Sequence, residues 1–168
     1  MNTEEYQHAL SGQIESAGKN DDSSAVLGVA AGDDRYLIPM TEVSEVIPAP
    51  KLARVPLTQS WFLGLANVRG NLYGITDLGA YLGRHSVPFN LKSRILLVSP
   101  DNKFYGGFIV NSMLGIRSLS EFTPVEPGRK KLPKNVIAQY KDTEERLWWQ
   151  LSLFELIRDA KFLQIARE

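Results

Sequence analysis

Cysteine is absent from all 168 residues, and histidine occurs only at positions 8 and 85. The lack of cysteine excludes disulfides, thiolate metal sites and cysteine nucleophiles. Histidine is the commonest general base and metal ligand, but neither His8 nor His85 has a local partner at metal-ligand spacing. We therefore expect a protein with no metal and no cofactor.

Net charge and long apolar runs are missing as well. The 19 basic and 19 acidic side chains cancel, which argues against a nucleic-acid or acidic-membrane binder. No apolar run approaches the roughly 18 residues of a membrane span. The N-terminus is acidic and polar, unlike a secretory signal. We expect one cytoplasmic domain, without membrane insertion, whose 43% hydrophobic residues supply a core.

A catalytic constellation is also missing. The carboxylate pairs Asp33-Asp34 and Glu144-Glu145 fall in expected turns, where such charges are usually solvated. Asp77 is the one carboxylate beside an apolar run, and the capping of a short helix that Gly83 ends accounts for it. An enzyme that uses Asp77 is the remote alternative, and we expect no catalysis.

Short apolar segments between turn residues make up most of the chain. Residues 1–24 differ: Tyr6, Leu10 and Ile14 lie at helical spacing, and both a frayed tail and a docking helix remain open. About ten short strands at hairpin spacing follow, which is typical of small barrels or of a sandwich. We expect a first barrel over about 25–90, a second over about 91–151, and a C-terminal helix over 153–166 that opens with a capping box, Ser152 and Glu155.

One segment stands out, residues 61–83. Phe62–Val68 and Leu72–Thr76 flank Arg69-Gly70-Asn71 and read as a β-hairpin. Glycine weakens a strand unless a bulge or another backbone comes close, so Gly64 and Gly74 indicate such an approach. Upstream, Val43–Ile47 reads as a single helical turn stopped by Pro48.

The basic loop Arg129–Lys134 supports a competing hypothesis, a small barrel that binds oligonucleotides. Such a barrel needs aromatic side chains beside its cations. The candidate aromatics Trp61, Phe62 and Tyr73 lie beside the hairpin instead, so we expect a solvated connector.

The hairpin resembles the CheW-like family of chemotaxis coupling proteins. The segment FLGLANVRGNLYGITDL matches the family's pattern of a glycine, a short strand, Asn-apolar-Arg-Gly, a second strand and an Asp-Leu helix start. Upstream, YLIPM and then VSEVI match its strand and its Val-x-Glu turn. The similarity covers about residues 25–161, and the ending WWQLSLFEL is similar to the PilI branch, which serves type IV pilus twitching motility.

The resemblance implies a fold and a function. The fold is mainly β, with two intertwined five-stranded SH3-like barrels and a few short helices. The function is that of a non-catalytic adaptor in the cytoplasm. It links the cytoplasmic tip of a methyl-accepting receptor, within membrane-bound receptor arrays, to a histidine kinase whose regulatory domain is itself CheW-like.

The resemblance also implies coupling residues. The family positions fall on Val43, Glu45, Gly64, Arg69 and Gly70. We expect the glycines to leave room for a partner's helix and Arg69 to pair with a partner's carboxylate. Two positions depart from the family, because Gly74 stands where proline is usual and Asn111 where aspartate is frequent.

Overall fold

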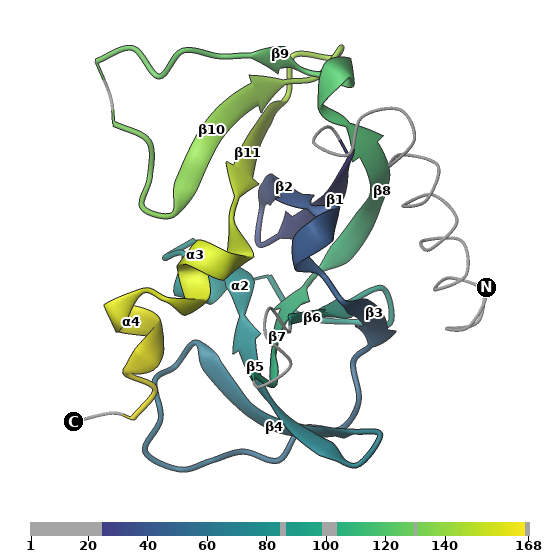
Figure 1. Cartoon of the computed structure of the whole chain (residues 1–168), viewed down its shortest axis with the longest axis vertical. Helices are drawn as coiled ribbons and strands as arrows, with labels where there is room; N and C mark the ends of the chain where they lie inside the picture. Colours follow the sequence, from purple (N-terminus) through teal and green to yellow (C-terminus); the bar gives the residue numbers. More distant parts are fainter. Residues whose placement is uncertain (1–24, 85–86, 99–103, 130, 167–168) are drawn as a thin grey trace.

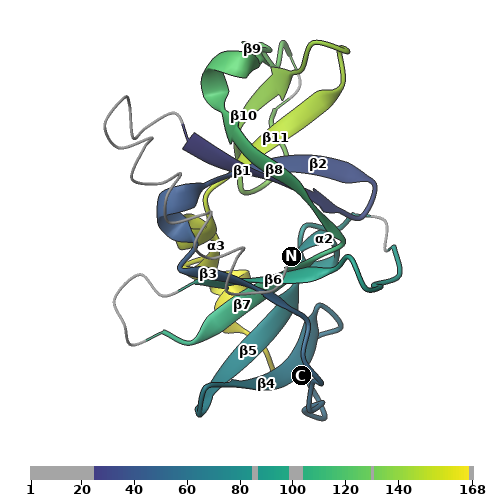
Figure 2. The ribbon, with the colours of Figure 1, turned by 90° about the vertical axis from the view of Figure 1, so that its right-hand side faces the viewer.

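Two β-sheets, one above the other, form the molecule (Figures 1 and 2). The computed structural model describes residues 25–84, 87–98, 104–129 and 131–166. The upper sheet has the order β8-β1-β2-β11-β10-β9, and the lower sheet has the order β3-β6-β7-β5-β4. The predicted mainly β fold with two sheets and few short helices is therefore confirmed, with β9 as a two-residue sixth strand of the upper sheet.

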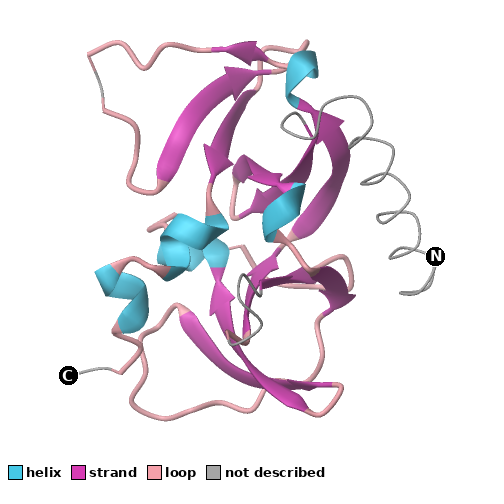
Figure 3. Cartoon of the chain, in the orientation of Figure 1, coloured by secondary structure: helices cyan, strands magenta, loops and turns pink. Residues whose placement is uncertain are grey.

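The two strands of the predicted hairpin appear at nearly the expected bounds, as β4 and β5. The upper sheet contains β1 (Ala25–Ala31), β2 (Asp34–Pro39), β8 (Ser112–Ser118), β9 (Thr123–Pro124), β10 (Val136–Lys141) and β11 (Leu147–Leu151). The lower sheet contains β3 (Glu45–Pro48), β4 (Phe62–Val68), β5 (Asn71–Asp77), β6 (Arg94–Val98) and β7 (Gly106–Val110). Three short helical segments lie between strands, η2 (Met40–Glu42), α2 (Leu78–Tyr81) and η3 (Leu119–Glu121) (Figure 3). Two more follow β11, namely α3 (Leu153–Ile157) and α4 (Ala160–Leu163).

The sheets do not divide at residue 90, so the predicted split into barrels over 25–90 and 91–151 is wrong. β1 pairs with β8, and β2 pairs in parallel with β11, so the chain's first hairpin belongs to the sheet of its C-terminal half. In the lower sheet, β6 and β7 join β3 and β5. Hairpin spacing identifies neighbours along the chain, but these long-range pairs depend on which faces can be buried together.

Both faces of the central strands are buried. Along β6, Ile95 and Leu97 belong to a small core inside the lower sheet, whereas Leu96 and Val98 belong to the large core between the sheets. The upper sheet encloses a third cluster around Trp148. A strand that is buried on both faces reads as a continuous apolar run, as Ile95–Val98 does.

A buried carboxylate joins η2 to the helix that follows the last strand. Glu42 accepts hydrogen bonds from the Ser152 hydroxyl (2.8 Å) and from the backbone amides of Leu153 (2.8 Å) and Phe154 (3.3 Å). The predicted cap is confirmed on one side, because Ser152 Oγ accepts from the Glu155 amide at 3.3 Å. Glu42 thus satisfies first-turn amides of α3 that have no partner within the helix.

The predicted helix over 153–166 is wrong in its extent, because it is two short helices. Asp159 has an extended backbone (φ −65°, ψ 136°) and its side chain caps α4 by accepting from the Lys161 amide. This local bond competes with a continuous helix. The break turns α4 onto the lower half of the molecule, where Phe162 stacks on Trp61 with 5.9 Å between ring centroids.

Candidate interaction surface

The tip of the β4–β5 hairpin is a two-residue turn, Arg69-Gly70. Both residues have positive φ angles, 53° and 87°, and Val68 pairs directly with Asn71. This is the type I′ geometry, in which Asn-Gly is the favoured pair. The side chain of Asn67 supports the turn by accepting from the Gly70 amide at 3.0 Å. Arginine is unfavourable at the first position because its φ is positive, which indicates a structural or binding role for its side chain.

Arg69 reaches across to Glu45 of β3. Its Nη1 donates to Glu45 Oε2 at 2.9 Å, and its Nη2 donates to Glu45 Oε1. The Arg69 side chain remains 67% exposed, against 14% for Glu45. A planar two-point pair of this kind fixes the direction of both groups. The predicted coupling residues Glu45 and Arg69 therefore meet each other.

Arg69 therefore already binds a carboxylate of its own chain, and the reason lies in the shape of the lower sheet. β3 is its first strand and β4 its last, so the pair spans opposite edges. The sheet curls enough to bring the hairpin tip to β3, which is the closure typical of a small barrel. The side of the Arg69 guanidinium that does not contact Glu45 faces solvent.

Val43 lies two residues before Glu45 in extended chain. Its φ and ψ are −110° and 116°, so the predicted helical turn over Val43–Ile47 is wrong. The helical turn lies immediately before Val43, in η2 (Met40–Glu42). The residues from Glu45 onward form β3, which pairs with β6. β-branched Val46 and Ile47 suit a strand. Val43 itself is half-buried against the core between the sheets.

A pair of tyrosines has one member near the ion pair, because Glu45 and Arg69 both act on the Tyr73 hydroxyl. Tyr73 of β5 and Tyr105 meet edge to face, with 5.3 Å between ring centroids. Partial burial raises the pKa of the Tyr73 hydroxyl, helped by Tyr105 and Glu45, while Arg69 opposes the rise. Sequence reasoning missed the role of this pair, because Tyr105 is far along the chain and joins the surface only through the parallel pairing of β5 with β7.

Gly64 is required by the chain's own backbone. Its φ is 131°, and a Cβ atom there would lie 2.3 Å from the carbonyl oxygen of Ala53. Ala53 and Leu65 exchange two backbone hydrogen bonds of 2.8 Å at this point. The predicted bulge and close approach are confirmed, but the expectation that Gly64 leaves room for a partner's helix is wrong. At Gly70, by contrast, a Cβ would meet nothing within 4 Å.

The two departures from the family pattern have internal explanations. The Gly74 amide donates to the Tyr105 carbonyl at 3.1 Å, a bond that proline could not make. The Asn111 amide group donates to the carbonyl of Val87 at 2.9 Å, while its oxygen accepts from the Gly32 amide at 2.8 Å. An ionised aspartate could accept but not donate, so the asparagine suits both contacts.

The other candidate residues do not form a reaction centre. Asp77 caps α2 by accepting a hydrogen bond from the Ala80 amide at 3.1 Å, as predicted. Burial raises the pKa of the Asp77 carboxyl, although the backbone hydrogen bonds from Ala80 and Gly79 act to lower it. His8 and His85 lie outside the described residues. Within residues 25–84, 87–98, 104–129 and 131–166, no group of three metal-ligating side chains is close enough to hold an ion.

None of the helices in these ranges has the length and apolar character to cross a membrane.

The basic loop is separate from the aromatic residues of the hairpin. Lys134 pairs with Asp159 at 3.3 Å, and Lys130 lies outside the described residues. Trp148 is buried in the upper sheet, and Trp149 lies under the guanidinium of Arg84, 4.4 Å from its carbon to the ring centroid. The described part of the loop therefore lacks the cation-and-aromatic platform that single-stranded nucleic acids use.

Comparisons with known proteins agree with this geometry. Residues 25–161 match the model of the CheW-like domain. The chain is 34% identical over 107 residues to Protein PilI of Pseudomonas aeruginosa, and this match covers 64% of the chain and 57% of PilI. It is 32% identical over 124 residues to chemotaxis protein CheW of Helicobacter pylori, covering 71% of the chain and 74% of that relative. The chain thus spans less than two thirds of PilI.

A solved structure supports the fold. The crystal structure of scaffolding protein TtCheW from Thermoanaerobacter tengcongensis superposes with a TM-score of 0.66 at 20% identity, covering 78% of this chain and 85% of that one. At this identity the likeness concerns the fold. The family model, by contrast, matches most of the sequence and includes the hairpin and β3. The chain belongs to the family of proteins with a CheW-like domain.

Proposed function

We propose that this protein is a non-catalytic adaptor that couples a methyl-accepting receptor to a histidine kinase with a CheW-like regulatory domain. The observation that carries the proposal is the Glu45–Arg69 pair, formed by two residues at family coupling positions within a CheW-like domain. The names of its relatives, chemotaxis protein CheW and scaffolding protein TtCheW, support the same class of function.

The coupling surface would comprise Val43, Glu45, Arg69 and Gly70. The pair holds an exposed guanidinium at a rigid turn, and a partner's carboxylate can bind its open side without breaking the bonds to Glu45. Gly64 would contribute indirectly, by letting Ala53 approach β4 and so setting the path of the hairpin. A single contact of this kind is weak, so array assembly would depend on several contacts at once.

Twitching motility is the proposed setting. The resemblance of the C-terminal segment to the PilI branch supports it, and so does the 34% identity with Protein PilI. In this setting the protein would work in the cytoplasm, beside membrane-bound receptors.

The test is reconstitution with the kinase and receptor fragment of the host. The wild-type protein should co-sediment with the receptor fragment and raise kinase phosphorylation, and failure with every kinase–receptor pair of the host would overturn the proposal. A charge-swapped protein, Glu45→Arg with Arg69→Glu, keeps an ion pair between the strands but reverses the exposed charge. It should fold normally yet couple poorly, whereas full coupling would show that the pair acts only by closing the barrel.

A further inference from the structure

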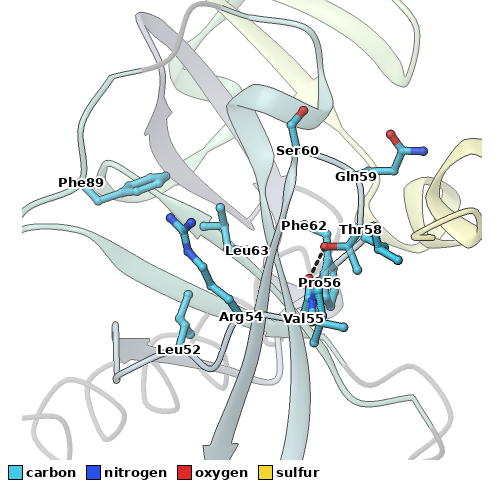
Figure 4. Close-up of a pocket in the computed structure, with 11 residues that line it drawn as sticks. Leu52, Arg54, Val55, Pro56, Thr58, Gln59, Ser60, Phe62, Leu63 and Phe89 are labelled. Carbon is cyan, nitrogen blue, oxygen red and sulfur yellow. Dashed lines mark hydrogen bonds between the residues drawn. The ribbon is translucent and has the colours of Figure 1, made fainter. Parts of the chain in front are cut away.

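A groove opens at the opposite end of β4 from Arg69 (Figure 4). Its volume is about 690 Å³, and its walls are mainly apolar, with Leu52, Val55, Pro56, Phe62, Leu63 and Phe89 beside a polar stretch over residues 58–60. Arg54 is the only ionisable side chain that lines it, and Figure 4 shows its guanidinium directed across the groove toward Phe89 and Leu63. A ligand that fits here needs an apolar side and a negative charge.

The loop that forms the groove is held in a costly conformation. Leu57 has a φ of 59°, in the left-handed region that disfavours a side chain of its kind, and it is 80% exposed. The positive φ costs stability. The loop is nevertheless fixed at each end, by the bonds between Ala53 and Leu65 and by the Gln59 amide, which donates to the Ile165 carbonyl at 2.8 Å. Backbone strain in a preformed loop is typical of binding sites.

The charges of the chain are unevenly distributed although they sum to zero. Between residues 46 and 100 the only carboxylate is Asp77, which caps α2. The cations of this stretch are Lys51, Arg54, Arg69, Arg84, Lys92 and Arg94. Residues 1–24 have the opposite balance, since Lys19 is their single cation and their carboxylates are Glu4, Glu5, Glu15, Asp21 and Asp22.

The acidic N-terminal segment also carries the apolar side that the groove needs. Tyr6, Leu10 and Ile14 recur at a spacing of four, with Glu4, Glu5 and Glu15 at either end of this stripe. Residues 15–24 would connect it to β1, and ten extended residues reach about 33 Å. A globular domain of this size has a radius of gyration of about 15 Å, so a fully extended connector spans about twice that radius.

We propose that residues 4–15 of this chain bind in the groove of the same molecule, with their apolar stripe against its walls and their carboxylates beside Arg54. A segment bound there would shield the groove from other apolar ligands until one displaced it. The inference concerns a site apart from the Glu45–Arg69 pair and does not rest on the proposed adaptor function.

The absence of cysteine provides a direct test on the full-length protein. Ser11→Cys, outside the apolar stripe, gives a single attachment point for a nitroxide spin label. Amide signals of Phe89 and of residues 52–63 other than Pro56 should lose intensity through paramagnetic relaxation, and signals of the upper sheet should not. Because exposed charges are screened, the effect should weaken at high salt.

Two variants and one matched control make the test decisive. Arg54→Glu should restore the groove signals, whereas Arg129→Glu, the same charge reversal on the other basic loop, should leave them attenuated. Leu10→Asp should also restore them, and it alters no residue of the sheets, so misfolding is not a concern there.

Three results would overturn the inference. The first is attenuation centred away from the groove. The second is attenuation that persists in Leu10→Asp. The third is attenuation seen only when spin-labelled protein is mixed with unlabelled, isotope-enriched protein, because the occupant would then be the segment of a second copy.

Discussion

Arg69, at the tip of the β4–β5 hairpin, forms a two-point hydrogen-bonded pair with Glu45, on the strand at the opposite edge of the same sheet. One contact therefore closes the lower barrel and presents a cation to solvent. These two roles make different demands on position 69, and substitutions can separate them.

Arg69→Asn should weaken coupling without weakening the fold. Asparagine is favoured at a positive φ in a type I′ turn, and an exposed ion pair contributes at most about 1 kcal/mol. We expect the free energy of unfolding in urea to stay within about 0.5 kcal/mol of wild type. Receptor-dependent kinase activation should fall. Arg129→Asn, the same change on an exposed loop, should leave activation intact, and an unfolded Arg69→Asn protein would instead make Arg69 structural.

Gly64→Ala and Gly70→Ala should differ in their cost. At Gly64 the new methyl group would lie 2.3 Å from the Ala53 oxygen, and backbone atoms cannot move aside cheaply. At Gly70 the space is open and only the positive φ opposes the change. We expect a loss of more than about 2 kcal/mol at Gly64 and of about 1 kcal/mol at Gly70. Thermal unfolding of both proteins measures the difference, and equal losses would contradict the close approach.

Asp142 should make stability depend on acid pH. Burial would raise the pKa of its carboxyl, but bonds from the Trp148 indole, the Arg146 amide and guanidinium and the Glu144 amide outweigh it and hold the pKa well below its usual value. A depressed folded pKa stabilises the native state above the unfolded value of about 3.9, and this contribution is lost as the pH falls toward the folded pKa.

The stability gap between wild type and Asp142→Asn should therefore be largest near neutral pH and shrink as the pH falls below about 4. Urea unfolding across this range measures it. Glu144→Gln, at an exposed neighbour in the same turn, is the control and should show a much smaller gap. A gap that does not change with pH would refute the assignment.

Glu42→Gln should destabilise the junction between the sheets. Glu42 accepts from one hydroxyl and two amides, and an amide side chain would place a donor against some of these donors. A buried group left without a partner costs about 1–3 kcal/mol, so we expect a loss in that range. Glu155→Gln, at an exposed position of α3, should cost far less. Chemical denaturation of the pair of variants checks the prediction.

The local pattern predicted the strands but not all of their partners. The apolar run around Ile95–Val98 had to be a strand, because its length and its β-branched residues favour no alternative. Nothing local shows that β2 pairs with β11 or β5 with β7. Val43–Ile47 was misread for the same reason, since a short segment before proline becomes a strand only through its pairing with β6.

The candidate surface was predicted in part. The family resemblance identified Glu45 and Arg69 individually, and the glycines in the strands indicated a close approach. The contact between the two side chains depends on the curl of the whole sheet, which no spacing in the sequence expresses. Likewise, Glu42 and Ser152 are 110 positions apart, and their bond follows from the packing of the sheets.

The interleaving of the two sheets has a consequence for how the chain acquires its structure. The β1–β2 hairpin is made first, yet its neighbours β8 and β11 come from the far end of the chain. During synthesis this hairpin stays without its partner strands, and with its apolar surface exposed, until all strands of the lower sheet have left the ribosome. Such non-local topology slows folding, and a chain released early would leave both barrels open. The molecule should therefore fold and unfold as one cooperative unit, with no barrel that survives alone.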